Sequence, residues 1–126
     1  MKLTRIYASA DGESHIEEID LPVETPGERA VTAFVPALQT GFSVVSVSGA
    51  QDWHPAPRRQ LVTVLSGALE IECSDGSARR FGPGESFIAD DLRGRGHVTR
   101  YPAGPVRLHY VHLPDGFDFG RWTAGP

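Results

Sequence analysis

One stretch of the sequence, from Trp53 to Gly67, sets a proline-flanked histidine just ahead of a β-branched apolar run. The run from Gln60 to Leu65 favours a strand, because β-branched side chains fit the pleated, half-buried surface of a sheet. Gly67 is typical of a tight turn after that strand. We expect the surrounding strands to form a pocket, to which a second histidine, His97, returns beside His54.

Short apolar runs separated by turn residues recur along the chain, which has 14 glycines and 10 prolines. The Asp75-Gly76 pair is the strongest hairpin signal, and no segment has a sustained helical period. This pattern favours an all-β sandwich or barrel of eight or more short strands. The strands expected are Leu3–Ala8 and His15–Leu21 (as an N-terminal hairpin), Ala30–Val35, Phe42–Ser48, Gln60–Leu65, Ala68–Cys73, Ser77–Phe81, Ser86–Ala89, His97–Tyr101 and Val106–Leu113.

Length and composition narrow the classes of protein. A chain of 126 residues predicts one domain, with a core at about 42–113, an N-terminal hairpin region at 1–35 and an aromatic tail at 114–126. A net charge of −4 argues against a nucleic-acid binder. The absence of an apolar run of membrane-spanning length favours the cytoplasm and no membrane partner. The single cysteine, Cys73, alternates with Leu69 and Ile71, which favours a buried small hydrophobe over a catalytic thiol.

The central stretch resembles the first motif of the cupin superfamily. That motif contains His-x-His, three or four residues, a glutamate, six residues and a glycine. Here His54 and Ala56 stand at the histidine positions, Gln60 at the glutamate position and Gly67 at the glycine. The sequence looks like small single-domain bacterial cupins whose first motif reads His-Pro-Ala-Pro-Arg-Arg-Gln. The resemblance implies a cupin-type double-stranded β-helix, also called a jelly-roll barrel.

The second cupin motif is also recognisable, with changes. Gly84 looks like its start, Asp90 stands where the motif has a proline, and the following loop is two residues longer than the pattern. His97 then fills the histidine position and Tyr101 replaces the asparagine. The resemblance therefore covers most of the chain and is specific for the fold, whereas the metal-ligand positions are altered.

A cupin site usually supplies three histidines and one carboxylate for iron, manganese, nickel or zinc. In this chain the resemblance implies His54, Gln60 and His97 as the remaining ligands of a divalent metal. The neutral amide of Gln60 would offset none of the metal's charge. A third histidine (His109 or His112, of which at most one faces inward), Asp90 or Asp91 would restore the ligand set. The alternative is that His54 and His97 are hydrogen-bonded pocket histidines without a metal.

Other polar residues near the motifs are candidates with simpler alternatives. An inward Arg58 would bind a carboxylate substrate, and Arg100, beside His97, is a second candidate for substrate binding, together with Gln60. The simpler alternative for both arginines is that they are solvated or salt-bridged at the barrel mouth. Tyr101 is a candidate general acid or a packing residue of its strand.

We therefore expect a small cupin that binds a small organic molecule in its barrel. The reading favoured is an enzyme of the isomerase, lyase, cyclase or dioxygenase type, in which His54 and His97 act as acid and base or hold a metal. The alternative is a binding or sensing module without turnover. The resemblance, together with Leu61 and Leu65 facing away from the pocket, predicts a homodimer.

Overall fold

The computed structural model describes residues 1–23, 29–46 and 49–124. Its elements are the strands β1 (Lys2–Ala8), β2 (Ser14–Asp20), β3 (Gln39–Val45), β4 (Gln60–Cys73), β5 (Ala78–Phe81), β6 (Ser86–Asp90) and β7 (His97–His112) and the short helix α1 (Phe119–Thr123). Within these ranges no helix has the length and hydrophobicity needed to cross a membrane.

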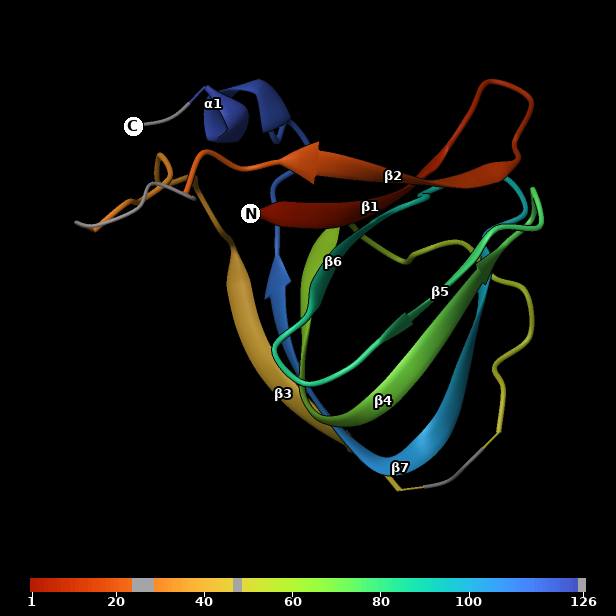
Figure 1. Cartoon of the computed structure of the whole chain (residues 1–126). Helices are drawn as coiled ribbons and strands as arrows, with labels where there is room; N and C mark the ends of the chain where they lie inside the picture. The colour runs from red at the N-terminus through yellow and green to blue at the C-terminus, as the bar shows by residue number, and fades with distance from the viewer. Residues whose placement is uncertain (24–28, 47–48, 125–126) are drawn as a thin grey trace.

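The seven strands form one sheet that curls without closing. Its order is β2-β1-β6-β4-β7-β3, and β5 pairs with β4 beside this path. Among the strands in the described ranges, β1 and β6 pair in parallel and the other pairs are antiparallel. In Figure 1 the β1–β2 hairpin lies across the top, while β3, β4 and β7 sweep around the lower side as long curved strands. The all-β expectation is confirmed, and so is the N-terminal hairpin.

Two of the expected turns are wrong, because the chain bends there without leaving the sheet. The expected strands around Gly67 are one continuous strand, β4, and the two expected near residues 102–105 are likewise joined in β7. Register shifts between Val64 and Glu70 show that bulges absorb the bend. Gly67 has a φ of +77°, and a Cβ there would lie 2.6 Å from the Pro105 oxygen, so a glycine is needed for this close approach.

Three further expectations differ from the structure. The segment Ala30–Val35 is irregular rather than a strand, and β3 begins at Gln39 instead of Phe42. The expected end of that strand, at 47–48, lies outside the described residues. Helix α1 was not expected, because it is one short turn whose start depends on a local cap: the Asp118 carboxylate accepts from the Gly120 amide.

The core has two clusters on opposite faces of the sheet. The inner one lies inside the curled sheet around Phe81, Val64 and Ile71. The second contains Ile88, against which the partly buried Leu61 and the tail aromatics pack. The tail aromatics, Phe117, Phe119 and Trp122, thus pack on their own domain, against the same cluster as Leu61.

Cys73 belongs to the inner cluster and is fully buried, as expected for a small hydrophobe. Burial raises the pKa of its thiol to about 11. The group is therefore a protonated thiol at neutral pH, which is not the nucleophilic form of cysteine.

Candidate functional site

The two motif histidines meet, as the sequence predicts. His54, in the irregular segment before β4, and His97, the first residue of β7, form an antiparallel bridge. The His54 amide donates to the His97 carbonyl oxygen at 3.2 Å, and the His97 amide donates back to the His54 carbonyl oxygen at 3.0 Å. Their ring centroids lie 5.1 Å apart with the planes tilted by 49°. The backbone thus fixes the pair in a single arrangement.

Gly96 makes this close approach possible. It has a φ of +74°, a conformation that residues with a Cβ rarely adopt. A Cβ at this position would lie 2.0 Å from both the carbonyl carbon and the oxygen of His54. The loop before β7 can therefore lie against the segment bearing His54 only because residue 96 is a glycine.

Hydrogen bonds set the tautomer of both imidazoles. The Nδ1 of His54 lies 2.8 Å from the Asp52 carbonyl oxygen, which can only accept, so this nitrogen carries the hydrogen. The Nδ1 of His97 lies 2.6 Å from Oδ2 of Asp91, and a carboxylate oxygen likewise accepts. In the neutral rings each Nε2 then keeps a lone pair, which suits a general base, a hydrogen-bond acceptor or a metal ligand.

Asp91 is buried behind this pair and positions it. Its side chain is 0% exposed, and Oδ1 is the only buried side-chain oxygen or nitrogen in the described residues that has no hydrogen-bond partner. Its backbone oxygen also accepts from the Ala56 amide at 3.0 Å. Asp91 is therefore tied both to His97 and to the segment that carries His54.

Asp90, the neighbouring carboxylate, has a different role. Its side chain is 2% exposed and pairs with Arg5 and with Arg59, at 2.6 Å in each case. Burial alone would lower the pKa of Arg5, but hydrogen bonds to Glu17 and Asp90 raise it overall. Asp90 thus joins β1, β6 and the segment before β4, and it does not face the histidines.

A cavity of about 210 Å³ opens beside the histidines inside the curled sheet. Apolar side chains of β4, β6 and β7 form one part of its wall, including Val62, Leu69 and Phe87. The polar part consists of Gln51, His54, Gln60, His97, Thr99, Tyr101 and Tyr110. The volume is on the order of that of a single-ring molecule, since a cavity of about 150 Å³ can hold benzene.

The structure brings together some of the residues expected at the site and separates others. His54, Gln60, His97 and Tyr101 all line the cavity. Burial, followed by the neighbouring Tyr110, raises the pKa of the Tyr101 hydroxyl, which is therefore a hydrogen-bond donor at neutral pH.

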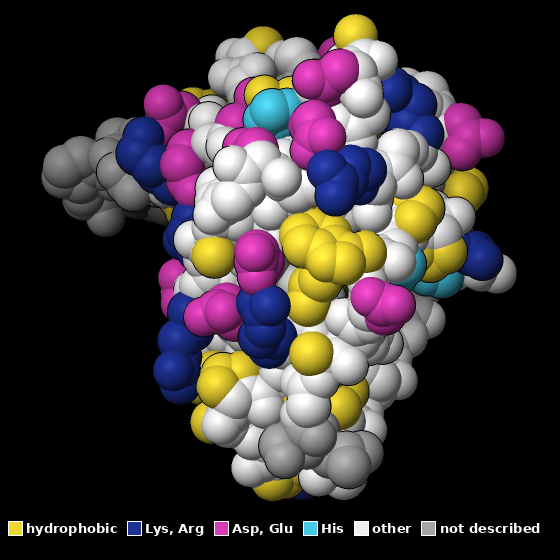
Figure 2. Space-filling view, turned by 90° about the vertical axis from the view of Figure 1, so that its right-hand side faces the viewer, with side chains coloured by type: hydrophobic (Ala, Val, Ile, Leu, Met, Phe, Trp, Pro, Cys, Tyr) yellow, Lys and Arg dark blue, Asp and Glu magenta, His cyan; other side chains and the backbone are white. Residues whose placement is uncertain are grey.

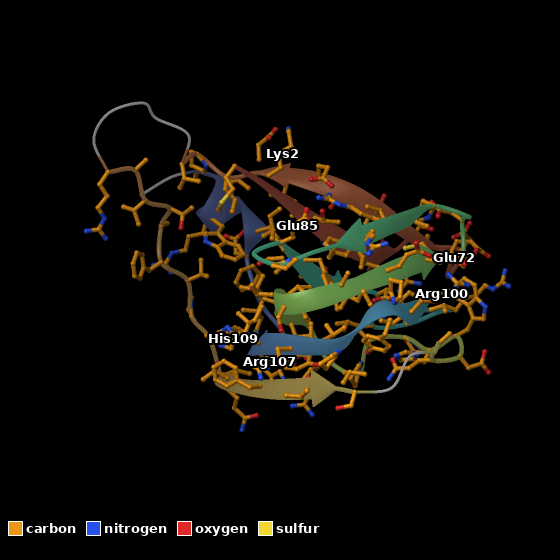
Figure 3. All side chains as sticks on the ribbon, turned by 60° about the horizontal axis from the view of Figure 1, so that its bottom comes forward. Lys2, Glu72, Glu85, Arg100, Arg107 and His109 are labelled. Atoms are coloured by element: carbon orange, nitrogen blue, oxygen red, sulfur yellow. The ribbon has the colours of Figure 1, made fainter. Side chains whose placement is uncertain are left out.

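The two arginines expected to bind substrate lie elsewhere. Arg58 is exposed and does not line the cavity, because the prolines on either side of Ala56 keep this segment out of the strand alternation on which its inward direction depended. Arg100 pairs with Glu72 at 2.7 Å and with Glu70 at 3.5 Å on the outside of β4. Figure 3 shows Arg100 and Glu72 side by side.

The sequence reasoning missed Tyr110, Gln51 and Thr99, which also line the cavity. The alternation of β7 contains the signal for Tyr110, because Leu108 and Tyr110 share one face whereas His109 lies on the other, stacked on Phe42 at 4.7 Å. His112 contacts Gln39 at the sheet edge. Neither His109 nor His112 therefore lines the cavity.

Comparison with known proteins bears on the fold. No family model matches the chain, and no curated protein matches its sequence. Among solved structures, the cupin domain of Schizosaccharomyces pombe Cnp3 superposes with a TM-score of 0.51 at 16% identity, covering 90% of this chain and 84% of that one. The chain has a cupin-type fold. A protein of unknown function from Rhizobium leguminosarum has a TM-score of 0.50 at 21% identity, covering 75% of this chain and 90% of its own.

At these identities the similarity establishes the cupin-type fold alone. At the positions where the resembled motif has its second histidine and its glutamate, this chain has Ala56, which is buried in the cavity wall, and Gln60. No group of three or more His, Cys, Asp or Glu side chains in the described ranges could hold a metal ion. Two imidazoles and one neutral amide therefore fit a tightly held transition-metal ion poorly.

Proposed function

We propose that this cupin binds a small organic molecule in its cavity and acts on it by acid–base chemistry at His54 and His97. The observation that carries the proposal is the hydrogen bonding of the two Nδ1 atoms, at 2.8 and 2.6 Å, which leaves an Nε2 lone pair on each ring in the wall of a partly open cavity with polar and apolar lining. Imidazole titrates near neutral pH and is the side chain used most often as a general base.

The neighbouring residues support distinct roles in such a reaction. Asp91 holds the tautomer and orientation of His97 and stabilises an imidazolium there, so it is a positioning residue. The Tyr101 hydroxyl is the proposed proton donor to a developing oxyanion, and Gln60 the proposed ligand contact through its amide. Reactions that move a proton on one small molecule, as isomerases, lyases and cyclases do, need only these groups.

A screen of small cyclic and carbonyl compounds by NMR, followed for binders by product analysis, tests the proposal. The variants His54→Ala and His97→Ala should each lower turnover by about 10²-fold or more, the usual contribution of a positioned acid or base. His109→Ala is the matched control, because this histidine stacks on Phe42 outside the cavity. Turnover that survives both site variants would contradict acid–base catalysis at this pair.

A binding or sensing role without turnover is the second candidate. It is favoured by Ala56 and Gln60, which leave the cavity without the ligand set that supports metal chemistry in cupins. Support for this candidate over the enzyme would come from a compound that shifts NMR signals of cavity residues only. The compound would also remain chemically unchanged after prolonged incubation, with no product formed.

A divalent metal held by His54, Gln60 and His97 stays a prediction with its own test. Elemental analysis of protein purified without a histidine tag, before and after incubation with iron, manganese, nickel and zinc, measures it directly. Near-stoichiometric metal that is lost in both His54→Ala and His97→Ala would establish the site. In that case the ion would supply Lewis-acid chemistry, with the two imidazoles as its ligands.

We also propose that the chain forms a homodimer through the outer face of β3. Four exposed apolar side chains lie on this strand and the segment before it, namely Phe34, Leu38, Phe42 and Val44, and a fifth, Leu65, lies on β4 beyond the neighbouring β7. Strand β3 is at the edge of the sheet, and Figure 3 shows Arg107 and His109 beside it on β7. Such an edge can pair with its own copy across a two-fold axis.

The area of this face supports the dimer. Phe34 and Phe42 are 77% and 74% exposed. With about 200 Å² for a large side chain and about two thirds of each one exposed on average, burying all five on both subunits removes roughly 1,300 Å² from water, which is within the range of a standard interface. Light scattering should give twice the 13.7 kDa chain mass. Phe42→Asp should yield a folded monomer, whereas Leu92→Asp, at an exposed leucine away from this face, should leave the dimer intact.

A further inference from the structure

The cavity wall has no fixed charge. None of its described lining residues is an arginine, lysine, aspartate or glutamate, although such residues make up 22% of the chain. The polar part of the wall consists of imidazoles, phenols, amides and one hydroxyl. Groups of this kind hydrogen-bond a ligand without neutralising an ionic one.

Of the arginines that neighbour cavity-lining residues in the sequence, Arg58 is exposed, and Arg59 and Arg100 are paired elsewhere. Arg59 donates to Asp90 at 2.6 Å and to the Asp115 carbonyl oxygen at 2.6 Å. Arg100 pairs with Glu72 outside the barrel. On the face in Figure 2, acidic and basic side chains are interspersed around a hydrophobic group, so surface charges of opposite sign lie near one another. A carboxylate inside the cavity would have no such partner.

A negatively charged side chain, that of Asp91, lies behind the wall at His97. Asp91 contacts Nδ1 of His97 and is fully buried. The His97–Asp91 pair is negative when the imidazole is neutral and the carboxyl group is ionised, and it is neutral when one of the two groups binds a proton. It is positive only when both groups are protonated. It therefore offers an anionic ligand no net attraction. A cationic ligand meets no carboxylate either, because Asp91 is not among the residues that line the cavity.

From these observations we infer that the cavity takes an uncharged ligand, with a compact apolar body and a hydroxyl, amide or carbonyl head group. The inference rests on the proposed binding function. The apolar body packs against Val62, Leu69 and Phe87, an N–H or O–H of the head donates to an Nε2 lone pair, and a carbonyl oxygen accepts from Tyr101. Transfer of an ionic analogue costs more, because its charge would be buried without a partner.

Three probes of nearly the same shape and different charge test the inference: benzamide, benzoate and benzamidine. Each is titrated into ¹⁵N-labelled, untagged protein at pH 8, and amide shifts at cavity residues give its Kd. Benzamide should bind at least about 10-fold more tightly than either ion, a difference of about 1.4 kcal/mol. Gln60→Lys places an ammonium group on the wall and should make benzoate the tightest of the three.

The outcomes separate the inference from the function on which it rests. Benzoate or benzamidine binding to the wild-type cavity as tightly as benzamide overturns the uncharged-ligand inference and leaves small-molecule binding standing. No cavity shift with any of the three, nor with phenol or cyclohexanone, at concentrations up to tens of millimolar overturns both. Shifts confined to residues outside the cavity count as no binding.

Discussion

Replacing Gly96 with alanine tests whether the histidine pair depends on one close backbone approach. The new Cβ would lie 2.0 Å from the His54 carbonyl carbon and oxygen and 2.3 Å from the Pro55 nitrogen. Separations this short cannot persist, so the loop before β7 must move away from the segment bearing His54. The movement breaks the two hydrogen bonds, of 3.2 and 3.0 Å, that join His54 to His97.

The expected cost has two parts. A φ of +74° strains any residue with a Cβ by about 1 to 2 kcal/mol. Each lost backbone hydrogen bond adds about 1 kcal/mol. Gly96→Ala should therefore lower the free energy of unfolding by roughly 3 to 4 kcal/mol, which is less than the 5 to 15 kcal/mol typical of a domain, so a folded protein should remain.

Gly76→Ala is the matched control, because Gly76 has a φ of +91° but no atom lies within 4 Å of the position that a Cβ would take there. It should show only the strain of about 1 to 2 kcal/mol. Urea unfolding measures both variants, and NMR of the histidine side chains reports whether the pair separates. Equal destabilisation of the two variants, with unchanged histidine signals in Gly96→Ala, would refute the close-approach argument.

Two further predictions concern buried groups. The pKa of Cys73 lies at about 11 in the folded protein, above its ordinary value near 9, so the stability that its protonated form contributes is complete below pH 9 and is lost as the pH rises towards 11. Urea titrations across this pH range should show a loss of about 2 kcal/mol in the free energy of unfolding. Cys73→Ala should remove that part of the pH dependence, and an unchanged pH dependence in this variant would contradict the assignment. The double variant Ala56→His/Gln60→Glu should bind zinc or nickel at least about 10²-fold more tightly than the wild type by calorimetry, because it adds an imidazole and an anionic oxygen at two cavity-wall positions. Equal metal affinity of the two proteins would show that these positions do not point at a common centre.

The sequence predicts the structure correctly where a local pattern coincides with the strand pairing that forms. The turn predicted at Asp75-Gly76 forms, and the Cys73 amide donates to the Ser77 carbonyl oxygen across it at 2.8 Å. The spacing around His54 and Gln60 predicted their common cavity, because the motif counts residues along one chain segment. Strand boundaries at Gly67 and 102–105 were wrong, since glycine and proline signal a bend and only long-range pairing decides whether the strand continues through it.

The parts of the site that could not be predicted depend on contacts between distant segments. The directions of Arg58 and Arg100 follow from the irregular path between Pro55 and Arg59 and from glutamates across the sheet. The role of Asp91 depends on its burial behind His97, whereas its neighbour Asp90 turns to Arg5 and Arg59. Two adjacent aspartates with such different surroundings look alike in the sequence.

The double attachment of Asp91 has a thermodynamic consequence. Its carboxylate holds His97 while its backbone oxygen holds the Ala56 amide, so the loop after β6 fastens the start of β7 to the segment that carries His54. Opening of that segment must disturb the orientation of His97, and a molecule that immobilises His97 must in turn slow the opening. Ligand occupancy and local order of residues 51–59 are thus linked quantities, and the exchange rate of a single amide proton, that of Ala56, reports on both.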